Sequence, residues 1–121
     1  MSHAASQAAA FYREVATTRK VWTIRDGAGY PAPKGTSGKR AQPFWSSLAR
    51  AERVIGTAPA YAGFAPHEIS WEKFCSAWVP GLTRDGLLVG VNWSGKLVVG
   101  YDLEPAEVAR NVAAVAQAAD A

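Results

Sequence analysis

Two short runs of alternating hydrophobic residues form the clearest pattern in the chain. Large apolar side chains occupy every second position of each run: Leu87, Val89, Val91 and Trp93, then Leu97, Val99 and Tyr101. A period of two is typical of β-strands. The dipeptide Ser94-Gly95 separates the runs, and glycine adopts the positive φ that a tight turn needs. The pattern therefore predicts an antiparallel hairpin over residues 87–101.

The opposite face of this hairpin carries Gly90 and Gly100 in mid-strand. A glycine inside a strand gives up side-chain packing, so it marks a bulge or the close approach of another group. We expect a helix packed tightly over this face, with a ligand crossing it as the alternative.

Apolar residues with helical spacing predict four helices, over residues 6–18, 43–55, 71–78 and 105–117. Pro43 and Pro105 stand at the first position of the second and fourth, where a missing N–H costs nothing. Ser70 is predicted to cap the third helix, and Pro80 with Gly81 to end or kink it.

A β-branched and aromatic stretch predicts a further strand over residues 21–25. Weaker patterns predict short strands over residues 29–32, 61–64 and 67–69. The stretch 34–41, KGTSGKRA, is polar, basic and without an apolar anchor, and we expect it to be a mobile loop.

This order of elements predicts the α+β class: a mainly antiparallel sheet of three to five strands with a hairpin in the C-terminal half, covered by about four helices. The 121 residues are expected to form a single domain, with residues 1–5 and 118–121 frayed. The strand order stays open.

Composition narrows the setting. With 49% hydrophobic and 19% charged residues, the chain has the profile of a soluble globular domain. It contains neither an apolar run of the roughly 20 residues that cross a bilayer nor a signal-peptide pattern, so we expect no membrane association and a cytoplasmic location. The one cysteine, Cys75, permits no internal disulfide and no cysteine-based zinc cluster.

Charge is divided unevenly along the chain. Residues 1–53 hold nine Lys and Arg against three acidic residues, whereas residues 54–121 hold four against seven. The basic half could converge on an anion-binding face, for which Lys34, Lys39 and Arg40 are the candidates, or fold against the acidic half.

Tests for catalytic motifs fail on spacing. The loop GTSGKR lacks two fixed positions of a phosphate-binding loop, and Asn92 stands where a nucleophile elbow at Ser94 requires glycine. His67 has no clustered partners for a metal, and nothing in the sequence near Cys75 would activate its thiol. We therefore assign no catalytic residue, no metal ligand and no cofactor.

The candidate ligand-binding residues lie on the predicted strands. Asn92 and Asp102 are polar residues at strand positions, which either satisfy backbone groups or line a pocket. Large aromatic side chains serve both core and pocket walls. The candidates are Trp22, Gly90, Asn92, Trp93 and Asp102.

Four segments together resemble one known family. They are Val21-Trp22-Thr23-Ile24-Arg25-Asp26 with Gly29, Pro43-Phe44-Trp45-Ser46, Phe74-x-x-x-Trp78-x-Pro80, and Gly86-Leu87-Leu88-Val89-Gly90-Val91-Asn92-Trp93. Over about residues 10–115 the chain resembles the small bacterial family known as domain of unknown function 2750. The resemblance implies a compact single-domain α+β protein of the bacterial cytoplasm, and it assigns no activity to any residue.

We expect a small non-enzymatic binding or interaction domain whose partner is a protein or a small molecule, with an immunity- or antitoxin-like role as one form. One alternative is an enzyme or small-ligand-binding domain with a pocket over the hairpin face. The other is nucleic-acid binding through the basic half. The partner and the oligomeric state stay open.

Overall fold

The computed structural model describes residues 2–35 and 37–120. The helices are α1 (His3–Thr18), α2 (Leu48–Thr57), α3 (Trp71–Lys73), α4 (Val79–Arg84) and α5 (Pro105–Asp120), with a short 3₁₀ turn η1 (Pro59–Tyr61) and a π-helical turn η2 (Phe74–Trp78). The strands are β1 (Lys20–Arg25), β2 (Ala41–Phe44), β3 (Ala65–Ser70), β4 (Leu88–Ser94) and β5 (Val99–Leu103). The predicted α+β class is confirmed.

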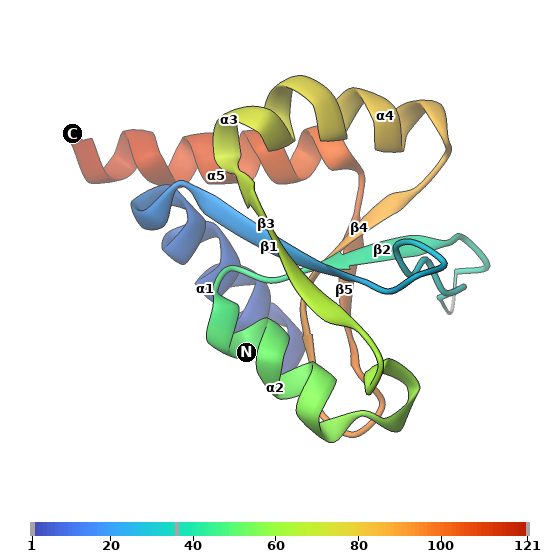
Figure 1. The fold of residues 1–121 in the computed structure, drawn as a ribbon. Coiled ribbons are helices and arrows are strands. Elements are labelled where there is room, and N and C mark those ends of the chain that lie inside the picture. The colour runs from blue at the N-terminus through green and yellow to red at the C-terminus, as the bar shows by residue number, and fades with distance from the viewer. Residues whose placement is uncertain (1, 36, 121) are drawn as a thin grey trace.

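The strands form two small sheets. β1 pairs antiparallel with β3, whereas the other sheet has the order β2-β4-β5, with β2 parallel and β5 antiparallel to β4. An antiparallel bridge between Trp22 and Trp45 joins the sheets, with backbone N···O distances of 2.8 and 2.6 Å. Thr23 adds a side-chain hydrogen bond to the carbonyl of Pro43 at 2.8 Å. The strands therefore form one twisted surface (Figure 1). We call the Trp22–Trp45 bridge the seam between its two sheets.

The two faces of this surface bury separate cores. On one face, α1, α5 and the helical segment 71–84 pack against β4, with Phe11, Val89, Val91 and Val108 among the buried residues. Figure 1 shows α1 and α5 side by side, with α3 and α4 along the far side of α5. On the other face, α2 packs against β1 and β3, and its core contains Trp22, Trp45, Val54 and Trp93.

β2 corrects the predicted helix at 43–55. Pro43 and Phe44 belong to a strand paired parallel to Gly90 and Val91 of β4. Proline is tolerated there because β2 is an edge strand of its sheet. The helix begins at Leu48, where the hydroxyl of Ser47 accepts a hydrogen bond from the Arg50 amide at 3.2 Å.

Of the two effects predicted for Pro80, an end or a kink of the helix, the end is wrong. Ser70 caps the helix as expected, accepting from the amide of Lys73 at 3.1 Å, but the helical path continues to Arg84. The π-helical turn Phe74–Trp78 precedes Pro80, which falls in the first turn of α4, where its missing N–H is not required.

The central hairpin exists, with a longer connection than the predicted two-residue turn. β4 ends at Ser94 and β5 begins at Val99, and the pairing is shifted between Val91 and Ser94 by a β-bulge at which Asn92 has φ +50°. In the second run, Leu97, which lies in the loop, and Val99 are 82% and 60% exposed, whereas Val89 and Val91 of the first run are fully buried. The bulge changes the alternation that the sequence pattern assumes.

One of the three weaker strand predictions is confirmed and two are wrong. Residues 67–69 lie in β3 as predicted, whereas residues 29–32 and 61–64 form no strand. A bridge between Lys34 and Arg40 closes the basic loop, of which Thr36 lies outside the described residues, and its mobility stays a prediction. α1 and α5 extend into the termini expected to fray; Met1 and Ala121 lie outside the described residues. None of the described helices combines the length and apolar character needed to cross a membrane.

Candidate functional site

Trp93 is the residue that the bulged hairpin is built around. Its indole Nε1 donates to Asp102 Oδ1 at 2.8 Å, and its carbonyl accepts from the Trp45 indole at 2.8 Å. A Cβ added to Gly90 would overlap the Trp93 ring, and one added to Gly100 would lie 3.0 Å from it. The group covering the two mid-strand glycines is therefore the chain's own indole, which corrects the expected helix.

Asp102 is held on the same side of the hairpin. Burial raises the pKa of its carboxyl group, while the hydrogen bond from Trp93 lowers it. A Cβ on Gly35 would come within 2.9 Å of Asp102 Oδ2, so the backbone of the basic loop approaches this carboxylate closely. A hollow of about 220 Å³ over this face is lined by Lys34, Trp93 and Asp102 among others. A small hollow therefore lies over the hairpin face, and its binding of a ligand stays a prediction.

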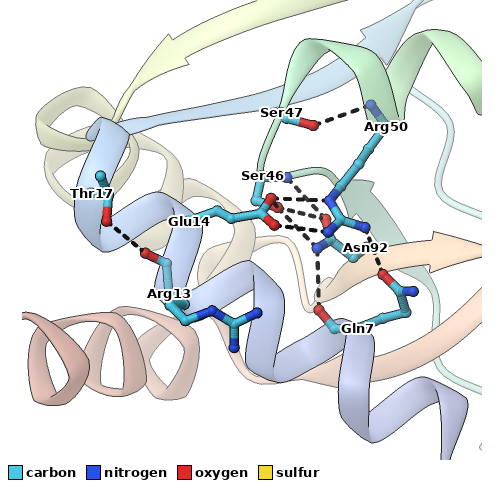
Figure 2. A network of polar contacts seen from close by, with 8 residues as sticks. All are labelled: Gln7, Arg13, Glu14, Thr17, Ser46, Ser47, Arg50 and Asn92. Atoms are coloured by element: carbon cyan, nitrogen blue, oxygen red, sulfur yellow. Dashed lines mark hydrogen bonds and ion pairs between the residues drawn. The ribbon is translucent and has the colours of Figure 1, made fainter.

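Asn92 points to the other side, into a buried polar network (Figure 2). Its Oδ1 accepts from the Ser46 amide at 2.9 Å, and its Nδ2 donates to Ser46 Oγ at 2.9 Å and to the Gln7 carbonyl at 3.2 Å. Asn92 is 1% exposed and Ser46 is fully buried. Asparagine suits this bulge because it tolerates the left-handed backbone conformation better than most residues.

An ion pair between helices α1 and α2 completes the network. Arg50 Nε and Nη2 donate to the two carboxylate oxygens of Glu14 at 3.0 and 2.8 Å, and its Nη1 donates to Gln7 Oε1 at 2.7 Å. Ser46 Oγ donates to Glu14 Oε1 at 2.7 Å. Hydrogen bonding by Arg50, assisted by Ser46, lowers the pKa of Glu14 against the opposing effect of burial. The network therefore fixes α1 and α2 relative to β4.

Beside this network lies a pocket of about 410 Å³, which we call the cationic pocket. It opens between the start of α1, helix α2 and the β4–β5 loop, and its charged lining residues Arg50, Arg53 and Lys96 are all basic. Trp45, Trp93 and Val54 supply an apolar wall. His3 Nε2 and Ser94 Oγ, 2.9 Å apart, join the start of α1 to the end of β4. The arrangement offers positive charge next to an apolar surface.

The predicted ligand-binding residues are only partly brought together. The indole of Trp93 contacts Gly90 and Asp102, and Trp22 lies in the same core. Asn92 instead faces the helices. Trp93 and Asn92 both line the cationic pocket. Their binding of a ligand stays a prediction.

The predicted anion-binding residues point to different partners. Lys39 forms an exposed ion pair with Glu104 at 3.7 Å, Arg40 Nη1 donates to the Ala32 carbonyl at 2.9 Å, and Lys34 lines the small hollow over the hairpin. Lys20 pairs with Glu68 at 3.6 Å. Two ion pairs thus connect the basic half to the acidic half, which is the alternative use of these charges.

Sequence reasoning missed most of the pocket and its network. Gln7, Glu14, Ser46 and Lys96 were not among the candidates, and Arg50 and Arg53 were considered only as members of the basic half that could converge on an anion-binding face. One local signal was present: Ser46-Ser47 before an apolar helical stretch is a helix start, which would have moved the helix and placed Arg50 in its first turn. The ion pair with Glu14, 36 positions away, has no local signal.

The described residues contain no group of three or more His, Cys, Asp or Glu side chains able to hold a metal ion. Burial raises the pKa of the Cys75 thiol, with a smaller opposing effect of Arg19, so the unreactive protonated form is favoured. The chemistry on offer at the cationic pocket is therefore charge, hydrogen bonding and apolar contact.

These features define a small α+β domain organised around a bulged hairpin, with a buried polar network beside a basic pocket. A family model matches residues 8–112, and the chain belongs to that family, described as protein of unknown function (DUF2750). The resemblance found in the sequence is thereby confirmed. No curated protein matches the chain.

Proposed function

We propose that this protein is a small non-enzymatic binding domain that holds a small anionic molecule with an apolar part in the cationic pocket. The observation that carries the proposal is the lining: three basic side chains, Arg50, Arg53 and Lys96, and no acidic residue among the described residues around about 410 Å³. Pockets of this size with a few convergent polar groups are typical of ligand sites.

Two of the three charges are available to a ligand. Arg50 uses three N–H groups on Glu14 and Gln7. Arg53 and Lys96 take part in none of the ion pairs among the described residues. A carboxylate or phosphate between them would gain charge-assisted hydrogen bonds, while the indoles of Trp45 and Trp93 would contact an aromatic or aliphatic part.

Binding without catalysis is supported by how the polar groups beside the pocket are used. The carboxylate of Glu14 accepts from both Arg50 and Ser46, and the amide of Asn92 is bonded on both sides. A general base needs a lone pair directed at the substrate. These groups are instead committed to holding the walls in place.

The test is calorimetric titration with phenyl phosphate and with phenol as the neutral analogue. We expect phenyl phosphate to bind and to be recovered unchanged, and phenol to bind about tenfold more weakly, which corresponds to roughly 1.4 kcal/mol. The double variant Arg53→Gln and Lys96→Gln should weaken phenyl phosphate by at least about tenfold. Arg84→Gln is the matched control, because Arg84 is exposed and lies outside the pocket.

Equal binding of phenol and phenyl phosphate, or an unchanged affinity of the double variant, would refute an anion site. Turnover of phenyl phosphate would refute the non-enzymatic part of the proposal. Because Arg53 and Lys96 are surface side chains without ion pairs, their replacement leaves the buried network intact.

A second candidate function, self-association, is favoured by the exposed apolar side chains at the end of the hairpin. Leu97, Val99 and Tyr101 are 82%, 60% and 44% exposed, and β5 is an edge strand of its sheet. Such an edge pairs readily with another strand. We propose a second copy of the chain as the partner. Light scattering should show a dimer that Val99→Lys converts to a monomer, and a monomeric wild-type protein would exclude this candidate.

The immunity- or antitoxin-like role and nucleic-acid binding stay predictions. The ion pairs of Lys20 and Lys39 with acidic residues do not favour a continuous basic surface for nucleic acid. Binding of nucleic acid that falls steeply with salt concentration would bring that prediction forward.

A further inference from the structure

A second pocket has the opposite chemical character. About 320 Å³ in volume, it lies where the segment after β1 meets the helical segment 71–84, and we call it the acceptor-lined pocket. It is lined by Tyr30, Gln42, Ala77, Trp78, Gly81, Leu82, Asp85 and Leu87. The charged residue among them is Asp85, and no Lys or Arg is among the described lining residues.

The orientation of the Gln42 amide in this pocket is fixed by its neighbours. Thr23 Oγ1 donates its hydrogen to the Pro43 carbonyl at 2.8 Å, and lies 3.2 Å from the Gln42 side-chain nitrogen. A hydroxyl has one hydrogen to donate, so Thr23 can only accept from Gln42. The NH₂ group of Gln42 therefore faces Thr23, and its carbonyl oxygen faces away.

That carbonyl oxygen is open to the pocket. Gln42 is 4% exposed, and its side chain makes the hydrogen bond to Thr23 as its one contact of this kind within the described part of the chain. Yet every fully buried side-chain nitrogen or oxygen of the described residues has a partner. Oε1 must then reach accessible space, and the pocket that Gln42 lines provides it. The pocket thus presents a positioned acceptor on a nearly buried residue.

Aromatic rings stand beside this acceptor. Tyr30 and Trp78 meet edge to face with centroids 5.1 Å apart, and His67 lies 5.8 Å from Tyr30 and 6.4 Å from Trp78. Burial, with help from Arg25, lowers the pKa of His67, which favours its neutral form near neutral pH. Aromatic rings attract cations through their negative faces. The faces of Tyr30 and Trp78 can therefore attract a cation, whereas burial and the charge of Arg25 disfavour positive charge on His67 itself.

The remaining lining suits an alkyl chain that ends in a charge. Leu82 and Leu87 are apolar, and Asp85 contributes a carboxylate at the rim. Asp85 also lies 3.4 Å from Arg84 Nε, an exposed contact in which both side chains remain more than half accessible. Exposed pairs of this kind are weak, so the carboxylate can exchange Arg84 for a ligand.

We propose that the acceptor-lined pocket binds an alkylammonium group. The ammonium N–H groups donate to Gln42 Oε1 and to the Asp85 carboxylate, and the alkyl chain packs against Leu82, Leu87 and Trp78. The site is separate from the cationic pocket, shares none of its lining residues, and does not depend on the function proposed above.

The test is titration of the ¹⁵N-labelled protein with n-butylammonium, followed by NMR through the Trp78 indole and Gln42 side-chain amide signals. We expect saturable shifts of both signals, and about tenfold weaker binding of 1-butanol, which has the same chain without the charge. Asp85→Asn and Tyr30→Ala should each weaken n-butylammonium several-fold while leaving the remaining spectrum unchanged. Asp26→Asn is the control, an exposed carboxylate outside the pocket.

Equal affinity for 1-butanol, absence of saturable shifts, or unchanged affinity in both variants would each overturn the proposal. Two exposed positions are used because Gln42 is itself nearly buried and its replacement would disturb Thr23. A Gly-Lys-Gly peptide blocked at both ends identifies the source of the group. Tighter binding than n-butylammonium indicates a lysine side chain of a partner, and weaker binding indicates a free amine; both outcomes support the alkylammonium site.

Discussion

The two pockets differ in which polar groups remain free for a ligand once the chain's own hydrogen bonds are made. Around the cationic pocket, the acceptors of Glu14 and Asn92 are bonded to Arg50 and Ser46, so the charged groups left facing the space are the cations Arg53 and Lys96. In the acceptor-lined pocket, the donor of Gln42 is bonded to Thr23, so its acceptor remains. The chemical character of each pocket is thus set by the donors or acceptors that the chain's own hydrogen bonds and ion pairs leave free.

Both pockets also draw on one stretch of chain. Gln42, in β2, faces the acceptor-lined pocket, whereas Ser46, four positions on, lies in the network beside the cationic pocket. Every residue from Ala41 to Ser46 is buried. This buried segment therefore contributes to two sites of opposite charge, with Gln42 inside β2 and Ser46 beyond the end of the strand at Phe44.

Replacing Gly90 with Ala should produce the largest effect, because it displaces Trp93, which lines both the cationic pocket and the hollow over the hairpin. The new methyl group would overlap the indole of Trp93, which is held by Asp102 and is 5% exposed. Overpacking of this kind should lower the free energy of unfolding by about 3 kcal/mol, measured by urea denaturation. Gly63→Ala is the control, since a Cβ there meets nothing within 4 Å. Equal stability of the two variants would contradict the role given to Trp93.

Replacing Asn92 with Ala should follow, at about 2 kcal/mol in the free energy of unfolding. The change leaves the Ser46 amide without its partner and removes the bonds from Asn92 Nδ2 to Ser46 Oγ and the Gln7 carbonyl, and a buried unpaired amide is costly. Binding of phenyl phosphate should weaken while binding of n-butylammonium is retained. Gln117→Ala, at an exposed position of α5, gives the reference value. Loss of both ligands would show that the pockets are not independent.

A smaller effect should appear in the pH dependence of stability. The folded pKa of Glu14 lies below its ordinary value of 4.5, so its contribution is present above that value and is lost as pH falls through the folded pKa. Glu14→Gln should therefore reduce stability near neutral pH and flatten the loss of stability on acidification. The measurement is urea denaturation across this range, with the exposed Glu52→Gln as control. Parallel pH profiles for wild type and Glu14→Gln would disprove the assigned ion pair.

The smallest effect is expected at the other pocket. Tyr30 is 38% exposed and contacts Trp78 edge to face, a type of aromatic pair that contributes about 1 kcal/mol. Tyr30→Ala should lower the free energy of unfolding by about that amount and leave phenyl phosphate binding unchanged. Leu48→Ala is the control, at an apolar side chain that is 42% exposed and lies outside both pockets. A change in phenyl phosphate affinity would again couple the two pockets.

Local patterns predicted the parts of the fold that local physics determines. The helix from residue 6 to 18, the Ser70 cap and the presence of the hairpin follow from neighbouring residues and were all confirmed. β2 was missed because its partner β4 is more than forty positions away, and Pro43 also fits a helix start. The mid-strand glycines indicated a bulge as one possibility, but its position was not predicted, because the alternation pattern assumes an extended backbone at every residue and Asn92 has a positive φ.

The site was predictable in part, for the same reason. Gly90, Asn92, Trp93 and Asp102 stand out as glycine, polar or tryptophan residues on strands, and the hairpin does bring three of them together around one indole. The groups that give each pocket its charge come from separate elements. The role of Arg50 depends on its bond to Glu14, and that of Gln42 on its bond to Thr23, and only the folded chain places these partners side by side.

The seam between the two sheets also determines how the molecule can open. At the seam, the amides of Trp22 and Trp45 each donate a hydrogen bond to the other residue's carbonyl. Both indoles lie in the same core. Separating the sheets would break both hydrogen bonds and wet both rings at once. Slow exchange of these two protons with deuterium, at the rate of global unfolding, would show one cooperative unit. Faster exchange than the centre of β4 would show two units that loosen independently.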